Sequence, residues 1–312
     1  MIEIPPQPSA STPAPTVGPG APRLGAYVLL ADRAYLTESL TSYYDIVDTV
    51  VVIYDEDAIS WTGEALDLAP CFETIARLDR DKKVVQVPGR FHGGRRTALE
   101  LETFERNTAI RALGDSVDWV LQIDTDEVLG NPAQLVASVV KADAHGASAV
   151  EFPARWLYGH VDGQHFLERC RRLWGVSAGF PGPVAVRAGT ELTLARQCDA
   201  PLWRVDFRAH NTDPAHPSTT RVDESIDPSD GIWHFSWVRS EAEMRAKSST
   251  SGHAGEFDWT TEIDRWLWRC RHPRLTTFLT PLRHHPSVVG APTWLRVTRV
   301  PESVTGTGGA GQ

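Results

Sequence analysis

The chain of 312 residues is long enough for one large domain or two ordinary ones, and its 23% charged and 41% hydrophobic residues are typical of a globular protein with a sizeable core. Its 31 basic and 40 acidic residues give a net charge of −9, which argues against a nucleic-acid partner and an anionic membrane. The four cysteines contain no Cys-x-x-Cys pair, which argues against a zinc site or disulfide framework and indicates reduced thiols.

Both ends of the chain are predicted to be disordered. Residues 1–22 are rich in proline, serine, threonine and alanine, and residues 303–312 are rich in glycine, so neither segment has enough apolar surface to bury. The N-terminus lacks a signal-peptide pattern, and no run reaches the roughly 20 apolar residues of a transmembrane helix. We therefore predict a cytoplasmic protein without a transmembrane segment, folded over residues 23–302.

The first half of the folded region, residues 23–145, has the pattern of an open, mostly parallel α/β sheet flanked by helices. Strand–helix–strand repeats at this spacing form right-handed βαβ units. Apolar runs predict strands at 24–31, 47–54, 83–87 and 119–123, and helical spacing predicts helices at 34–44, 69–78, 97–113 and 131–141.

The second half, residues 146–302, has a different texture. Short extended pieces alternate with glycine and proline turns up to about Phe207, and a polar, loop-rich stretch follows at 210–230. Helices are predicted at 240–250 and 259–270. We expect this half to be antiparallel and loop-rich, with helices at its C-terminal end.

The fourth predicted strand ends on three closely spaced carboxylates, Asp124, Asp126 and Glu127. Clustered carboxylates repel each other unless water or a cation surrounds them. The carboxyl edge of an α/β sheet is also where such sheets bind ligands. We expect Asp124 and Asp126 to hold a divalent metal together with phosphate oxygens of a substrate. The alternative is a solvated turn in which Asp126 caps a helix.

Two side chains far from this run are candidates for the same site. His234, between two aromatic residues, is a candidate third metal ligand, and a mixed Asp/His site suits Mn²⁺ better than Mg²⁺. The alternative for His234 is a hydrogen-bonded core histidine. Asp55 closes the second strand at the same sheet edge, where it would accept a hydrogen bond from a base or a ribose hydroxyl, or act as a turn residue.

Several basic residues are candidate phosphate partners by charge. Arg95 and Arg96 lie in a glycine-containing loop, and Arg106 lies on the helix before the acidic strand. Arg106 is equally suited to be the ion-pair partner of that strand. Lys247 follows His234 by one helical stretch and could reach a diphosphate, or lie on the surface.

These elements together resemble the nucleotide-binding half of family 2 glycosyltransferases. The matching residues are Glu105-Arg106-Asn107 and the run from Trp119 to Glu127, which has the Asp-x-Asp-Glu ending of one branch. The segment Gly231–Trp237, with Lys247 and Ser251-Gly252-His253, is similar to that branch and to β-1,4-N-acetylglucosaminyltransferases that add a bisecting sugar. The resemblance implies a GT-A fold, a UDP- or GDP-sugar donor, and a divalent metal, usually Mn²⁺ or Mg²⁺.

The resemblance also implies roles for individual residues. Asp126 would bind the metal directly, Asp124 would bind metal or ribose, and Asp55 would face the base. His234 would be a further metal ligand. Members of this group mostly invert the anomeric carbon, with a carboxylate that deprotonates the acceptor hydroxyl. The stretch after the sheet and before His234, residues 199–230, contains no Glu-Asp dipeptide, and Asp223-Glu224 is the candidate base for a glycan, lipid-linked or small-molecule acceptor.

Two other functions fit parts of the same sequence. The run Asp124-Thr125-Asp126-Glu127-Val128 satisfies the nucleophile motif of haloacid-dehalogenase-like phosphatases, although those enzymes place it on the first strand. A non-catalytic relative that binds a nucleotide sugar or a glycan would lack the base carboxylate. Donor hydrolysis and metal dependence would separate these two functions from glycosyl transfer.

Overall fold

The computed structural model describes residues 22–217, 219–250, 258–279 and 294–306. Its larger sheet has eight strands in the order β11-β10-β6-β9-β4-β1-β2-β3. Every neighbouring pair in it is parallel except those made by β9. The strands are β1 (Leu24–Leu29), β2 (Thr49–Asp55), β3 (Val84–Gly89), β4 (Trp119–Gln122), β6 (Ala149–Glu151), β9 (Ala185–Arg187), β10 (Leu202–Asp206) and β11 (Glu224–Ser225).

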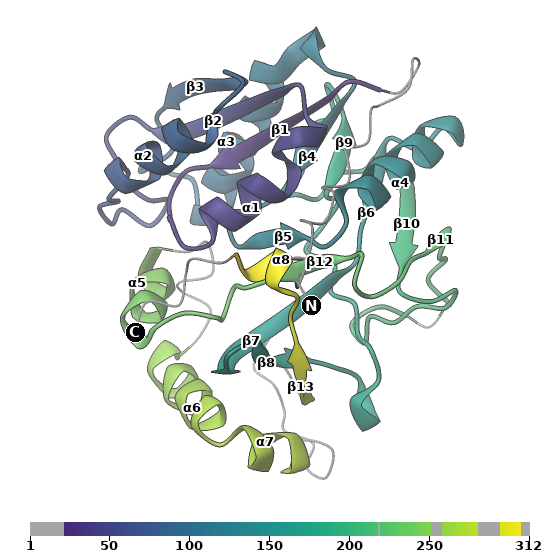
Figure 1. The fold of residues 1–312 in the computed structure, drawn as a ribbon. Helices are drawn as coiled ribbons and strands as arrows, with labels where there is room; N and C mark the ends of the chain where they lie inside the picture. The colour runs from purple at the N-terminus through teal and green to yellow at the C-terminus, as the bar shows by residue number, and fades with distance from the viewer. Residues whose placement is uncertain (1–21, 218, 251–257, 280–293, 307–312) are drawn as a thin grey trace, which may run out of the picture.

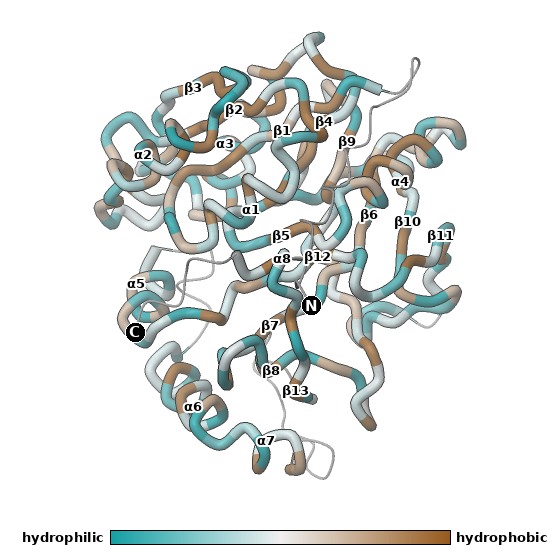
Figure 2. Tube along the Cα trace, viewed as in Figure 1, coloured by the Kyte–Doolittle hydropathy of each residue, from teal (hydrophilic) through white to brown (hydrophobic). Residues whose placement is uncertain are grey.

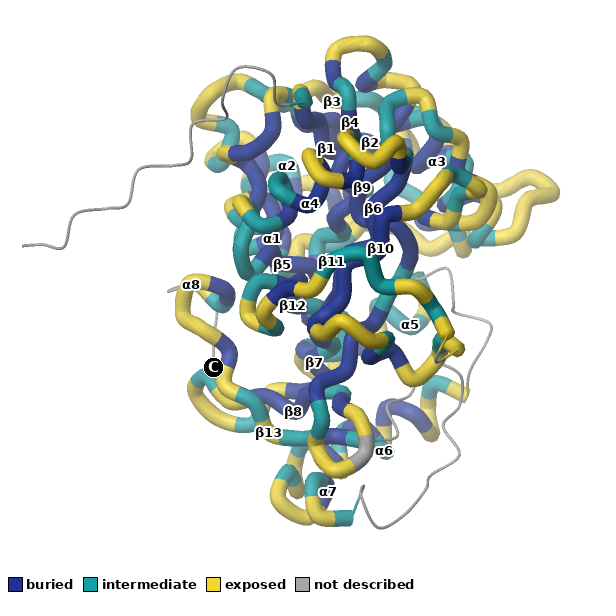
Figure 3. Tube along the Cα trace, turned by 90° about the vertical axis from the view of Figure 1, so that its right-hand side faces the viewer, coloured by how far each residue is buried: buried dark blue, intermediate teal, exposed yellow. Residues whose placement is uncertain are grey.

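Helices cover both faces of this sheet, because its strands are apolar on both sides. Ala26 and Val28 of β1 pack with helices α1, α2 and α4, whereas Tyr27 packs with α3 on the opposite face. Figure 2 shows hydrophobic segments along the central strands, and Figure 3 shows that β1, β2 and β4 are mostly buried, whereas the edge strand β3 is more exposed. The helices are α1 (Leu36–Tyr43), α2 (Ala69–Leu78), α3 (Ala98–Leu113) and α4 (Pro132–Ala144).

The smaller sheet lies below the larger one in Figure 1 and has the order β13-β8-β7-β12-β5. Its pairs are antiparallel except β12 with β7. Helices α5 (Glu241–Thr250), α6 (Trp259–Arg271) and α7 (Pro273–Leu279) follow it, and α8 (Glu302–Thr305) is near the C-terminus. The strands are β5 (Glu127–Leu129), β7 (Ala154–Asp162), β8 (His165–Arg169), β12 (Ile232–His234) and β13 (Leu295–Arg299).

The predicted fold class, an open and mostly parallel α/β sheet with an antiparallel second part and C-terminal helices, is confirmed. Two details differ. Residues 146–230 add four strands to the large sheet, so this sheet continues past the predicted division at residue 145. The disordered tail predicted from residue 303 begins too early, because α8 forms there and Val304 is buried in an apolar cluster. Residues 1–21 and 307–312 lie outside the described residues.

The described helices include none that is both long and apolar enough to cross a membrane. The longest, α3, has 16 residues, and its first turn is fixed by a capping box between Thr97 and Glu100. This cap sets where α3 begins. The helix then carries its charged residues, Glu105 and Arg106 among them, into the interior against β1 and β2.

Candidate functional site

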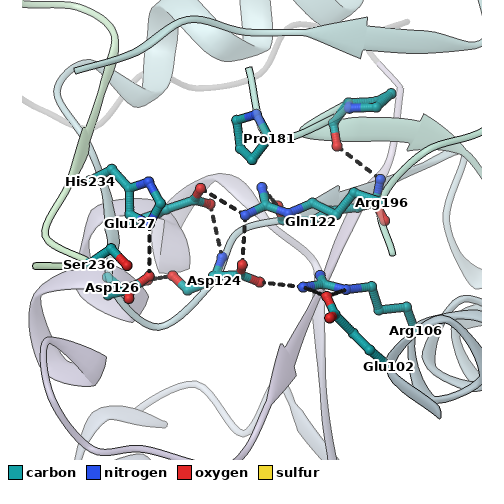
Figure 4. A network of polar contacts seen from close by, with 12 residues as sticks. Glu102, Arg106, Gln122, Asp124, Asp126, Glu127, Pro181, Arg196, His234 and Ser236 are labelled. Atoms are coloured by element: carbon teal, nitrogen blue, oxygen red, sulfur yellow. Dashed lines mark hydrogen bonds and ion pairs between the residues drawn. The ribbon is translucent and has the colours of Figure 1, made fainter. Parts of the chain in front are cut away.

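The acidic run joins the two sheets (Figure 4). β4 ends at Gln122, Asp124 and Asp126 lie in the turn that follows, and Glu127 begins β5. The Glu127 backbone N–H donates to the Asp124 carbonyl oxygen (3.0 Å), and the Glu127 carboxylate accepts from the Asp124 N–H (3.1 Å). The carboxylates therefore lie at the carboxyl edge of the parallel sheet, as the sequence predicts.

Two buried guanidinium groups hold Asp124. Arg106, on α3, donates from Nη2 to Oδ1 (3.0 Å), and Arg196, between β9 and β10, donates from Nη2 to Oδ2 (2.7 Å). Burial raises the pKa of Asp124, but the two guanidinium groups outweigh it and lower the pKa to about 2. Of the two roles predicted for Arg106, the structure supports the ion-pair partner of the acidic strand.

This pairing decides what Asp124 can bind. A divalent cation on either oxygen of Asp124 would be repelled by a guanidinium group bound to that same oxygen. Each oxygen still has a lone pair, so the carboxylate can accept a hydrogen bond from a neutral donor such as a ribose hydroxyl. The geometry therefore disfavours the predicted direct metal contact of Asp124 and favours its other predicted role, ribose binding.

Asp126 is buried among three basic side chains. Its Oδ2 accepts from Lys247 Nζ (2.5 Å) and Arg239 Nη2 (3.2 Å). Its Oδ1 lies 3.3 Å from His234 Nε2. Burial raises the pKa of Asp126, but the nearby Lys247, His234 and Arg239 hold the pKa well below its usual value. Asp126 is therefore a carboxylate at neutral pH. Lys247, predicted to reach a diphosphate, lies at this site.

His234 reaches the acidic turn through the pairing of two strands distant in sequence. β12 runs antiparallel to β5, which places His234 opposite Glu127. Trp156 packs edge-on against the imidazole with ring centroids 5.2 Å apart, and the Phe235 N–H donates to the Asp126 carbonyl oxygen (2.8 Å). Among the described residues, the buried Nδ1 of His234 has no hydrogen-bond partner. The imidazole therefore presents Nε2 to Asp126.

Asp126 and His234 fit a divalent cation. Two neighbouring ligands of an octahedral ion, each about 2.2 Å from it, are about 3.1 Å apart. The 3.3 Å between Asp126 Oδ1 and His234 Nε2 matches this separation. Two protein ligands leave the other positions to water and phosphate oxygens, which is the usual arrangement for a cation that carries a phosphorylated substrate.

A second group of potential metal-ligating side chains lies at the ends of β2 and β3. Asp55, Asp57 and His92 are the one such group in the described part of the chain with ligand atoms within 4.8 Å of one another. Asp55 Oδ1 accepts from the N–H groups of Asp57 and Ile59, and Oδ2 accepts from the N–H of Phe91 and lies 2.7 Å from His92 Nδ1. These four contacts use all its lone pairs, so Asp55 does not fit a metal ligand. The same saturation leaves no acceptor for the nucleotide base that Asp55 was predicted to face.

Asp55 instead fixes the loop after β3, which carries the predicted basic residues. Gly93 and Gly94 have positive φ angles of 70° and 78°, which glycine adopts without strain. Arg96 stacks over the Phe104 ring at 4.3 Å. The loop lines an open basic cavity of about 570 Å³, formed by Arg90, His92, Gly93, Gly94, Arg95, Arg96 and Leu101.

The structure places the predicted base pair, Asp223 and Glu224, away from the acidic turn. Asp223 accepts from the Arg204 N–H (2.9 Å), and Glu224 accepts from Lys141 Nζ (2.5 Å). Glu224 begins β11, with Asp223 just before it, and β11 is the edge strand, with three strands between it and β4. At a strand spacing of about 4.8 Å, this separation is about 19 Å. The geometry therefore does not bring these two carboxylates to Asp126.

The sequence reasoning missed two residues of the site, Arg196 and Arg239. Arg196 also donates to the Gln122 carbonyl oxygen and to Glu127, and Arg239 also pairs with Asp32. Arg239 follows the predicted His234 segment, so its charge was a usable signal. Arg196 lies in an irregular loop without a motif, and no sequence signal points to it.

Glu105, beside the site on α3, provides a test of the buried charges. Burial raises its pKa to about 8, although Trp61 Nε1 donates to its carboxylate (2.7 Å) and Arg106 is near. Unfolded glutamate titrates near 4.3, so the stability that protonated Glu105 contributes is complete below that pH and is lost as pH rises to 8. In urea titrations, Glu105→Gln should change little at pH 5 and add on the order of 2 to 4 kcal/mol to the unfolding free energy at pH 9.

The exposed Glu73 is the matched control, since Glu73→Gln should have the same small effect at both pH values. An equal change for Glu105→Gln at pH 5 and pH 9 would show that Glu105 titrates normally.

No protein-family model matches the sequence, and no curated protein matches it. Solved structures resemble parts of the chain. A mannosyltransferase from Pyrobaculum calidifontis in complex with GDP-Man and Mn²⁺ is 18% identical over 43% of this chain and 36% of its own, with a TM-score of 0.33. A 4-diphosphocytidyl-2C-methyl-D-erythritol synthase from Anaerococcus prevotii is 13% identical over 53% of this chain and 70% of its own (TM-score 0.31).

A mannose-6-phosphate isomerase from Helicobacter pylori is 14% identical over 50% of this chain and 58% of its own (TM-score 0.27). The matched region thus spans about a third of the mannosyltransferase and just over half of the isomerase. With TM-scores below 0.5, these likenesses identify no family for this chain.

Proposed function

We propose that this protein is a metal-dependent glycosyltransferase that moves a sugar from a nucleoside-diphosphate sugar to an acceptor hydroxyl. The observation that carries the proposal is the Asp126–His234 pair at the carboxyl edge of the parallel sheet, with Lys247 and Arg239 on the other carboxylate oxygen. Oδ1 of Asp126, beside His234, would bind the metal cation. Lys247 and Arg239, beside Oδ2, would bind a diphosphate. A nucleoside diphosphate bound to a metal supplies both charges.

The arrangement of the two sheets supports the GT-A fold implied by the sequence resemblance. The Asp-x-Asp-Glu run connects the last residue of a central parallel strand to the first strand of a second sheet. The second sheet also brings His234 beside it. The family 2 glycosyltransferases, including the branch with the same acidic ending, remain the resemblance that best accounts for this order of elements.

Each part of the donor has a matching group in the proposed site. Asp126 and His234 would hold the divalent cation, and the imidazole ligand favours Mn²⁺ over Mg²⁺. When bound, the cation offsets charge on the departing diphosphate. Lys247 and Arg239 would bind diphosphate oxygens, and Asp124 would accept from a ribose hydroxyl. The basic cavity that includes Arg95 lies at the same sheet edge for the rest of the nucleotide.

The phosphatase alternative is less well supported. It needs Asp124 as a nucleophile, but both of its oxygens are bound by guanidinium groups that lower its basicity and block approach to phosphorus. The strand that carries Asp124 is also the fourth of the chain. A donor-hydrolysis assay distinguishes the non-catalytic alternative from the transferase.

The proposal is tested by a thermal-shift panel of UDP-glucose, UDP-N-acetylglucosamine and GDP-mannose, each with and without Mn²⁺. A ligand that binds only the folded state raises the melting temperature by mass action. At least one donor should stabilise the protein, and only when Mn²⁺ is present. No stabilisation by any donor, or equal stabilisation with a chelator, would contradict the proposal.

His234→Gln tests the metal ligand separately. Loss of the imidazole should weaken Mn²⁺ binding by about 10- to 100-fold, as measured by titration of the paramagnetic signal of free Mn²⁺. His160→Gln on the solvent-exposed part of β7 is the control and should leave the titration unchanged. Equal Mn²⁺ affinity in both variants would return His234 to the core-histidine interpretation.

A further inference from the structure

A histidine–aspartate pair lies in the loop that follows β10. Asp213 is buried, and its Oδ2 lies 2.8 Å from His216 Nδ1. Its Oδ1 accepts from the Ala215 N–H (2.8 Å), which fixes the carboxylate in place. His216 is about a third exposed. Asp213 therefore orients an imidazole whose other nitrogen, Nε2, is available to a ligand.

Buried and half-buried charges of both signs surround this pair. Arg204 Nη2 lies 3.4 Å from His216 Nδ1, and Arg169 Nη2 lies 3.9 Å from Asp213 Oδ1. Glu151, at the end of β6, lies 3.8 Å from Arg204 Nε, and that Nε has no hydrogen-bond partner in the described residues. These groups, with Asp213, set the electrostatic environment of His216.

The register of the large sheet puts this loop at the same edge as the acidic turn. Leu121 is level with Ala185, Ala185 with Val150, and Val150 with Trp203. The chain therefore leaves β10 for the His216 loop at the level where it leaves β4 for Asp124. Two strands separate β10 from β4, so their carboxyl ends are about 14 Å apart.

A continuous path of contacts links the pair to the proposed metal ligand. The Arg169 guanidinium lies 5.4 Å from the centre of the Trp156 ring. The same Trp156 ring packs against His234. Arg169 also contacts Asp213. The His216 loop and the metal ligand thus belong to one contiguous part of the sheet edge.

The other acidic side chains between residues 199 and 230 are not placed for proton transfer. Asp199 precedes β10 and so lies at the opposite edge of the sheet. Asp206 is bound within its own loop, Asp227 caps its own turn, and Asp230 is bound to the N-cap residue of α4. Asp223 and Glu224 lie at the edge strand with their own partners.

We propose that His216 is the general base of the reaction and that Asp213 is its positioning residue; this inference rests on the proposed transferase function. The acceptor O–H proton moves to His216 Nε2 while the acceptor oxygen forms a bond to the anomeric carbon. The bond between that carbon and the diphosphate oxygen breaks, and its electron pair leaves with the nucleoside diphosphate. The imidazolium then releases the proton to water. In the absence of another acceptor, water takes the acceptor's place.

The test measures release of UDP or GDP from the panel donor that binds, with Mn²⁺ and water as acceptor, for the full chain and two variants. His216→Gln should lower the turnover number by about 10²- to 10⁴-fold, and the Kd of donor and Mn²⁺ should stay within twofold. The wild type should lose turnover at acidic pH, and His216→Gln should not. Asp213→Asn keeps the imidazole and should give a smaller loss with an altered pH profile.

His210→Gln is the matched control, because His210 is exposed in the same loop. Its turnover and pH profile should equal those of the wild type. If the wild type binds and hydrolyses a donor but His216→Gln retains both turnover and the acidic fall, the base assignment alone is overturned. If the wild type neither binds nor hydrolyses any panel donor, the proposed function fails and the base assignment fails with it.

Discussion

Asp126→Asn should abolish Mn²⁺-dependent binding of nucleotide sugars, with a loss of at least about 100-fold in donor affinity, while the fold is retained. The asparagine keeps the size of the side chain and a carbonyl oxygen for Lys247, but it removes the negative charge that a dication needs. Alanine is a poorer choice, since it would remove the side-chain oxygen that Arg239 and Lys247 share. Calorimetric titration and circular dichroism measure the two outcomes.

The exposed Asp115 provides a matched control, and Asp115→Asn should bind donor and Mn²⁺ as the wild type does. Asp126→Asn leaves Lys247 with less opposing charge, so any residual donor binding should be insensitive to Mn²⁺. If donor binding by Asp126→Asn still required Mn²⁺, the Asp126 carboxylate would not be a ligand of the metal.

Arg196→Met should lower the free energy of unfolding by about 3 to 5 kcal/mol, because it leaves the buried Glu127 carboxylate without its cation and Asp124 with Arg106 alone. Arg196 is 2% exposed and connects Asp124 to Glu127, with 2.7 Å to each carboxylate. Methionine has a similar length and no charge, so packing changes little. Urea denaturation at pH 7 measures the loss.

Arg23→Met is the control for this change, since Arg23 pairs with Asp118 at the surface. The denaturation midpoint of Arg23→Met should be close to that of the wild type. Equal midpoints for Arg196→Met and Arg23→Met would mean that the two carboxylates by Arg196 do not depend on it for their charge.

The elements with local sequence signals were predictable. The helix predicted at 69–78 has these bounds, since its apolar spacing and its early proline act within a few residues. The helix at 97–113 begins at a Thr–Glu capping box. A ligand site at the acidic run was also predictable, because carboxylates directly after an apolar strand indicate a bound ligand or cation.

The elements that depend on distant contacts were not predictable. β9 enters the large sheet antiparallel between β4 and β6, and only the assembled sheet determines that position. Arg196 follows Ala195, whose positive φ of 49° turns the chain inward, and alanine gives no sequence sign of such a turn. For Asp55 the sequence left a turn role and a nucleotide-binding role open for a similar reason, since two of its four partners, Phe91 and His92, are brought to it only by β3 and its loop.

The pairing of β12 with β5 has a consequence for the order of folding. More than a hundred residues separate His234 from Glu127, so closing this pair requires a large loss of chain entropy. During synthesis, the large sheet can begin to form before residue 234 has been made, whereas β5 stays unpaired until β12 has been made. A ligand that binds Asp126 and His234 together stabilises the pairing of β5 with β12. Mn²⁺ should therefore slow the separation of these two strands during unfolding.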